Sequence, residues 1–204
     1  MQRPATRARL AGLAALAALT LSACGSASST TATDPGAGTG TPTAPTTSSP
    51  PADVTPASGP VLSAGRFTFR APQGWADVTD RAETGVVLSA ANPTDENPLM
   101  IIVRHRAQAP GTVTAAAKAA TQMLKAAGGT DIRTRPATTV GGHQAAHVVA
   151  TQVKPGSHYQ LDAYYVLTGK DAWVITFATN QYTTPSRRST MLHSVLATCD
   201  WASA

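Results

Sequence analysis

The sequence predicts an α+β domain, an antiparallel β-sheet flanked by helices, behind a signal peptide and a disordered tether. Two stretches between residues 158 and 177 alternate apolar with polar side chains, as strands of an antiparallel sheet do. Residues 113–127 and 185–198 instead repeat apolar side chains at helical spacing. The predicted organisation is a signal peptide at 1–23, a tether at 24–60 and the α+β domain at 61–204.

The N-terminus has the pattern of a bacterial lipoprotein signal peptide. Arg3, Arg7 and Arg9 precede an uncharged stretch, Leu10 to Leu21, that is too short to span a bilayer. A Leu-Ser-Ala sequence then leads directly into Cys24, as in a lipobox. We expect Cys24 to carry a diacylglycerol, because two acyl chains anchor a protein stably. The protein is then expected at the cell membrane, lipid-anchored on its extracytoplasmic face; a retained transmembrane anchor and ordinary secretory cleavage are the alternatives.

Composition limits the partners that the domain could have. Lipidation of Cys24 leaves Cys199 without an intrachain partner, so the domain must be stable without a disulfide. From residue 61 onward, 13 Lys and Arg residues are set against 9 Asp and Glu residues, and the excess is scattered. A nucleic-acid partner is therefore not expected. We expect a monomer without a cofactor.

The tether, residues 25–60, consists almost entirely of Ser, Thr, Ala, Gly and Pro. Such a segment buries too little apolar surface to offset the entropy lost on ordering, so we expect disorder. Ser and Thr interleaved with Pro are also typical of O-glycosylated stalks. A glycosylated stalk and a bare spacer both fit this composition.

The first half of the domain should contain three strands and a helix. Strands are predicted at 66–70 and 85–90, and Pro72 with Gly74 should end the first strand and direct Trp75 toward the core. Residues 99–103 are apolar at every position, which predicts a strand covered on both faces inside the sheet. The polar loop 92–98 has too few ordered oxygen ligands for calcium. The helix at 113–127 should begin after an N-cap at Thr112 and stop at Gly128-Gly129.

The second half should add four strands, at 131–135, 143–153, 158–167 and 173–177. His143 and His147 have the spacing of a helical zinc motif, but Gln144 replaces the glutamate that this motif requires. In a strand, residues four apart are roughly 13 Å from each other, too far to share one metal ion. We therefore expect no metal site.

The last two strands should form a hairpin with one face toward the core. Tyr159, Leu161 and Tyr165 are expected to point inward. His158, Gln160, Asp162 and Tyr164 then share the opposite face, which is either partly wet or the lining of a pocket.

The final helix, 185–198, should be capped by Thr184 with Pro185 at its first position. Its apolar stripe includes Cys199, which we expect to be a small buried hydrophobic residue. Arg187 and Arg188 fall in the first turn, where the helix dipole disfavours cations. They are either an exposed pair or a site for an anionic group. The candidate partner-contact residues are Gln160, Asp162, Tyr164, Arg187 and Arg188.

Several short motifs resemble one known group of proteins. They are Phe67-x-Phe69-x-x-Pro72-x-Gly74-Trp75, Trp173-x-Ile175-x-Phe177 and the helix bearing Leu192-His193-Ser194-Val195. Together they are similar to the PsbP-like fold and, with the tether, to the LpqN family of actinobacterial lipoproteins. The resemblance covers roughly residues 61–201. It implies an α/β/α sandwich and a binding or assembly role at the cell envelope, and it supplies no catalytic motif.

Two functions are consistent with the sequence. The first is a noncatalytic envelope lipoprotein that binds a protein or lipid partner. The second is an extracytoplasmic hydrolase, although neither a G-x-S-x-G motif nor a paired-carboxylate motif occurs in residues 61–204. A Ser, a His and an Asp could still converge in space without leaving a linear motif.

Replacing Cys24 with Ala tests the anchor. Without the thiol there is nothing to acylate, so Cys24→Ala should release the protein from membranes or leave the precursor unprocessed. Membrane fractionation and mass spectrometry of the N-terminus measure both outcomes. A mature, acylated Cys24→Ala protein would contradict the lipobox interpretation.

Overall fold

The computed structural model describes residues 54–94 and 99–202. Cys24, the signal peptide and most of the predicted tether lie outside these residues, as does the end of the polar loop 92–98. Neither described helix combines the length and apolar character needed to cross a bilayer.

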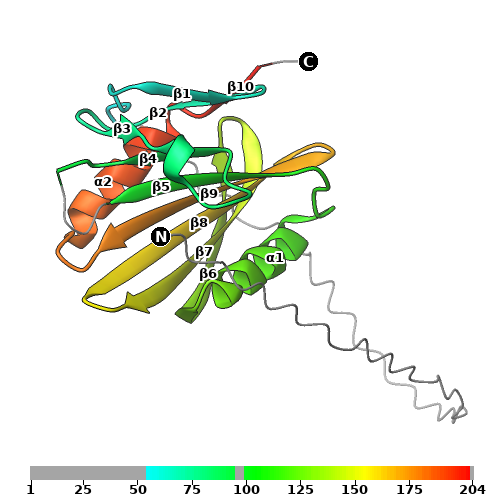
Figure 1. The fold of residues 1–204 in the computed structure, drawn as a ribbon. Helices are drawn as coiled ribbons and strands as arrows, with labels where there is room; N and C mark the ends of the chain where they lie inside the picture. The colour runs from blue at the N-terminus through cyan, green and yellow to red at the C-terminus, as the bar shows by residue number, and fades with distance from the viewer. Residues whose placement is uncertain (1–53, 95–98, 203–204) are drawn as a thin grey trace, which may run out of the picture. The chain divides into compact units, whose positions relative to one another are not determined.

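Antiparallel strands dominate the domain (Figure 1). A seven-stranded sheet has the order β3-β4-β5-β9-β8-β7-β6, and a three-stranded sheet has the order β1-β2-β10. In chain order the elements are β1 (Val61–Ala64), β2 (Phe67–Arg70), β3 (Ala76–Asp77), the 3-10 helix η1 (Thr79–Arg81), β4 (Leu88–Ala91), β5 (Met100–Arg106), α1 (Val113–Ala126), β6 (Gly129–Val140), β7 (His143–Lys154), β8 (Ser157–Thr168), β9 (Asp171–Asn180), α2 (Pro185–Leu196) and β10 (Asp200–Trp201).

The expected α+β class, an antiparallel sheet flanked by helices, is confirmed. Both helix starts are also as predicted: Thr112 caps α1 by accepting from the Ala115 N–H, and Thr184 caps α2 with Pro185 at its start. The strand predicted at 85–90 begins later, at Leu88, because the chain first turns with a Val86 N–H to Glu83 carbonyl bond. The weak strand predicted at 131–135 extends over twelve residues as β6.

Three short strands were not predicted: β1, β3 and β10. The expected order of three strands, helix, four strands and helix is therefore incomplete. Strands of two to four residues are too short to show a clear alternation, and β10 forms only because it pairs with β2, more than 130 residues earlier in the chain.

The packing also begins before Val61. Ala57 is buried, and its N–H donates to the Ser194 carbonyl of α2. Gly59 donates to the Ala71 carbonyl, with no room for a side chain between them. The described end of the predicted tether, residues 54–60, therefore packs on the domain, because its backbone amides find partners there.

Both faces of the large sheet are covered (Figure 1). On one face, Ala116, Ala120 and Leu124 of α1 pack on the sheet, and the small alanine side chains let the helix approach closely. On the other face, α2 and the three-stranded sheet enclose a second core. Every residue of β9 after Asp171 is buried, so this strand separates the two cores.

Phe67 is the centre of the second core. Its ring lies 5.0 Å from that of Trp173 and 4.8 Å from that of Trp201, centroid to centroid. Trp75 packs against the same cluster from the turn after β2, as the sequence predicted. Cys199 is free and buried here, and burial raises the pKa of its thiol far above the ordinary value. It therefore serves as a small hydrophobic residue.

Gly141 and Gly142 form a matched pair for testing this packing. Both have positive φ, +51° and +80°. A Cβ on Gly141 would lie 2.5 Å from the Trp201 ring, whereas a Cβ on Gly142 would meet nothing within 4 Å. Gly142→Ala should cost about 1–2 kcal/mol, from the left-handed backbone alone. Gly141→Ala should cost a further ~1–3 kcal/mol from overpacking. Denaturant unfolding measures the difference, and equal losses would show that the Trp201 ring and the Cys199 carbonyl both move aside without cost.

Candidate functional site

Alternate side chains of β7 and β8 form the floor of a pocket on the α2 face of the large sheet. In the strand register His147 is opposite Tyr164, and Val149 is opposite Asp162. The rings of His147 and Tyr164 stack with centroids 4.3 Å apart and planes 12° apart. His147 also reaches its diagonal neighbour, so that its Nε2 donates to Asp162 Oδ1 at 3.0 Å. The strand pairing therefore brings an imidazole, a phenol and a carboxylate into direct contact.

Helix α2 forms one wall of this pocket. The Thr184 Oγ1 accepts from the Arg187 N–H at 3.3 Å, which fixes the first turn. Arg188 then points over the floor, with its Nε 3.7 Å from Asp162 Oδ2. One turn later His193 lies on the same side, within 3.4 Å of Ser189 Oγ through its Nδ1.

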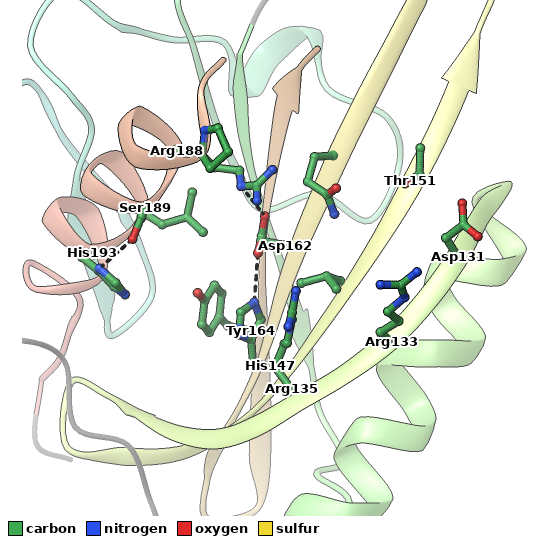
Figure 2. A pocket seen from close by; sticks show the side chains of 14 residues that line it. Asp131, Arg133, Arg135, His147, Thr151, Asp162, Tyr164, Arg188, Ser189 and His193 are labelled. Carbon is green, nitrogen blue, oxygen red and sulfur yellow. Dashed lines mark hydrogen bonds and ion pairs between the residues drawn. The ribbon is translucent and has the colours of Figure 1, made fainter. Parts of the chain in front are cut away.

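Strand β6 forms the other wall (Figure 2). Asp131, Arg133 and Arg135 alternate along it, and Arg135 is opposite His147 in the register. The two arginines are exposed, and neither forms an ion pair with another described residue. Figure 2 shows them on the side of the pocket opposite Arg188.

The cavity enclosed in this way, here called the Asp162 pocket, has a volume of about 440 Å³. Its lining is Asp131, Arg133, Arg135, His147, Val149, Thr151, Gln160, Asp162, Tyr164, Pro185, Arg188, Ser189, Leu192 and His193.

Two other cavities, of about 680 and 540 Å³, lie beside α1. The first is bounded by α1 and β6, and the second extends from the end of α1 across β5 and β9. Their charged lining residues all have side chains that reach solvent. The Asp162 pocket differs because it contains a buried carboxylate.

Asp162 is only 5% exposed, which is unusual for an acidic residue. Oδ1 accepts from His147, but Oδ2 has no hydrogen-bond partner, since Arg188 approaches it only to 3.7 Å. A buried charge is tolerated when it is paired and hydrogen-bonded, and this carboxylate satisfies that requirement on one oxygen only. Burial, together with the negative charge of Asp162, raises the pKa of the neighbouring Tyr164 phenol well above its ordinary value, despite the opposing effect of Arg188.

Four of the five predicted contact residues lie together in this pocket: Gln160, Asp162, Tyr164 and Arg188. Arg187 does not line it and is exposed instead. Consecutive helical residues point about 100° apart, and Arg187 falls on the side of α2 that faces away from the cavity. Gln160 is partly used by the fold, since its Nε2 donates to the Ala150 carbonyl at 2.9 Å.

Of the two environments expected for the Tyr164 face, the structure shows the lining of a pocket, and Tyr164 is more deeply buried there than the sequence indicates. The alternation of β8 is as expected, with Leu161 and Tyr165 facing α1 and Tyr164 facing the other way. Around Tyr164 this face is covered by α2 and the three-stranded sheet. Tyr164 is 4% exposed and belongs to the second core, with its ring edge-on to Phe177 at 5.9 Å. It lines the pocket and also supports the fold.

The β6 wall and the two histidines of the site, His147 and His193, are not among the residues predicted from the sequence to make partner contact. Arg133 and Arg135 occur at a spacing of two, which does indicate a shared polar face. Their position opposite β7 depends on a register that shifts twice, between Thr130 and Arg133 and again between Arg135 and Thr138. Such irregularities have no clear sequence pattern.

The groups required for nucleophilic catalysis are present but not connected in series. Ser189 contacts His193, whereas the carboxylate of Asp162 is bonded to a different histidine, His147. A Ser-His-Asp triad needs one histidine between the other two groups. His143 packs edge-on against Trp201, away from Asp162, and no cluster of three or more metal-ligating side chains occurs among the described residues.

Comparison with known proteins gives similarity of fold. No protein-family model matches the chain, and no curated protein does. LpqN of Mycobacterium tuberculosis, described as involved in cell envelope biogenesis, superposes with a TM-score of 0.52 at 12% identity, over 66% of this chain and 82% of LpqN. A Bacteroides thetaiotaomicron structure gives 0.50 at 13%, over 71% of this chain, which spans about half of that protein (49%). CyanoP, the PsbP protein of Synechocystis sp. PCC 6803, gives 0.47 at 13%, over 67% of this chain and 87% of CyanoP. The likeness to LpqN supports the predicted fold and does not extend to membership of the LpqN family.

The buried phenol predicts a specific response to alkaline pH. Tyrosines in the unfolded chain ionise near their ordinary pKa of 10.0, whereas folded Tyr164 keeps its proton. The unfolded state then binds fewer protons, so the free energy of unfolding should fall as the pH rises above about 10, by up to ~1.4 kcal/mol per pH unit. Tyr164→Phe should remove this contribution.

Tyr182→Phe is the control, because Tyr182 is 74% exposed and its substitution should leave the slope unchanged. Cys199 contributes in the same direction and is retained in both variants. Denaturant unfolding at a series of pH values gives the slopes. If Tyr164→Phe has the same slope as the unmodified protein, the phenol is not protected from ionisation by burial.

Proposed function

We propose that this protein is an exported lipoprotein, anchored to the cell membrane through Cys24, that acts as a noncatalytic binding or assembly module for a protein or lipid partner at the cell envelope. The observation that supports the binding role is the Asp162 pocket. A buried carboxylate with one oxygen lacking a hydrogen bond costs stability, and natural folds accept such a cost mainly where a site requires it.

The lining of the pocket supports recognition rather than bond cleavage. It contains three arginines, two histidines and two aspartates, and so offers hydrogen bonds and charge to a bound group. Its one serine–histidine contact lacks a carboxylate to orient the histidine. The cell-envelope role described for LpqN, a protein of similar fold, agrees with an extracytoplasmic location.

Site-specific photo-crosslinking in living cells tests the proposal with the full chain. A photoreactive residue at Thr151, in the pocket, should yield a crosslinked species, whereas one at Lys118, which borders the separate cavity between α1 and β6, should not yield that species. Arg188→Ala should abolish the product from position 151, and Arg187→Ala should preserve it, because only Arg188 faces the cavity. The mass of the product separates a protein partner from a lipid.

Arg188→Ala leaves Asp162 without its cation and could unfold the domain. Arg135→Ala is therefore measured beside it, since an exposed arginine on β6 can be removed without disturbing the core. A product that persists in both Arg188→Ala and Arg135→Ala, with their melting temperatures unchanged, would exclude the pocket as the binding site. Equal products from positions 151 and 118 would do so as well.

A further inference from the structure

We infer that the Asp162 pocket binds a protonated phosphate group, either inorganic phosphate or a phosphate monoester, with its P–OH donating to Asp162 and its ionised oxygens facing the arginines. This inference deepens the proposed binding function and rests on it. It names the chemical group that the pocket would recognise.

Arginines outnumber carboxylates around the cavity. Arg133, Arg135 and Arg188 line the cavity from two sides, against two carboxylates, Asp131 and Asp162. Of these three arginines, Arg188 alone forms an ion pair with either carboxylate in the described part of the chain. The unpaired guanidinium groups of β6 present planar hydrogen-bond donors suited to the oxygens of a phosphate or carboxylate. The pocket therefore favours an oxyanion.

The buried Asp162 carboxylate disfavours an anion that carries no proton. Its Oδ2 lies beneath Arg188 at 3.7 Å, in charge contact but without a hydrogen bond. An anion with no proton would face repulsion from this carboxylate. An anion that carries a proton can donate it in a hydrogen bond to Oδ2. Its other oxygens can then accept hydrogen bonds from the Arg188 guanidinium, which does not donate one to Oδ2. Inorganic phosphate has this combination of acidic proton and ionised oxygens at neutral pH, and a phosphate monoester has it at and below its second pKa of about 6.

The residues around Asp162 hold its carboxylate in position and place polar groups near it (Figure 2). Asp162 lies on the floor between the two walls, and its other oxygen is held by His147, so the carboxylate cannot turn freely. The side chain of Arg188, in the first turn of α2, is partly exposed, which leaves room for its guanidinium to shift toward a bound group. His193 and Ser189, one turn apart, add polar groups at the rim. A cavity of about 440 Å³ accommodates a phosphate together with part of the molecule that carries it.

Sulfate is the discriminating probe, because it has the shape of phosphate but keeps no proton at neutral pH. Calorimetric titration of the full chain, purified in a neutral detergent at low ionic strength and about pH 6, compares inorganic phosphate, glycerol 3-phosphate and sulfate. Phosphate should bind at least tenfold more tightly than sulfate, a difference of about 1.4 kcal/mol. Binding of both phosphates would identify a monoester as an acceptable ligand, and binding of inorganic phosphate alone would restrict the site to the free ion. Equal binding of phosphate and sulfate, or binding of neither, would overturn the inference.

Substitutions connect this selectivity to the pocket. Arg135→Ala should weaken phosphate binding at least fivefold with an unchanged melting temperature, while Arg187→Ala should leave binding unchanged. Asp162→Asn removes the repulsive charge, so sulfate should then bind within about twofold of phosphate. If Asp162→Asn does not fold, the Arg135→Ala result decides: unchanged phosphate affinity in that variant would exclude the pocket.

The failure of this inference is distinguishable from failure of the proposed function. A chain that binds no phosphate, yet gives a pocket-dependent crosslink from position 151, would still be a binding module with a different ligand. A chain that binds phosphate through Arg135 but gives no crosslink would have the site without the proposed partner.

Discussion

The large sheet is covered on both faces, and this constraint determines what each residue of its central strands can be. Successive side chains of β8 and β9 enter two different cores, one beneath α1 and one beneath α2 and the small sheet. A polar side chain on these central strands therefore faces the protein interior and needs a partner there. Asp162 is therefore held by His147 and Arg188, and those two residues come from the neighbouring strand and from the covering helix.

The same constraint explains where the pocket can form. Helix α2 covers only part of its face of the sheet, and β6 extends past it as the edge strand. The space between α2 and β6 is bounded by side chains that are not fully buried in either core. Polar residues gather there because water can reach them, while the floor below them is already inside the protein. The result is a pocket with a buried carboxylate at its base and solvent-exposed arginines at its rim.

Periodic features were predictable from the sequence, whereas features that depend on distant pairing were not. The alternation of β8 and the helical spacing of α1 and α2 established the fold class, and Thr112 and Thr184 marked both helix starts. The site was only partly predictable. Asp162 and Tyr164 were placed together because residues two apart share a face of a strand. Their contact with Arg188 and the position of Arg133 depend on tertiary packing and on two register shifts in β6, which no local pattern shows.

The three-stranded sheet has a consequence for how the chain is made. Strand β2 is paired on one side by β1, its neighbour in sequence, and on the other by β10 at the end of the described chain. Phe67 packs on Trp201, so the second core cannot be completed before β10 has been made. A chain synthesised from its N-terminus therefore cannot close this core until residues 200 and 201 have left the ribosome. Folding of this half of the domain follows its translation and does not accompany it.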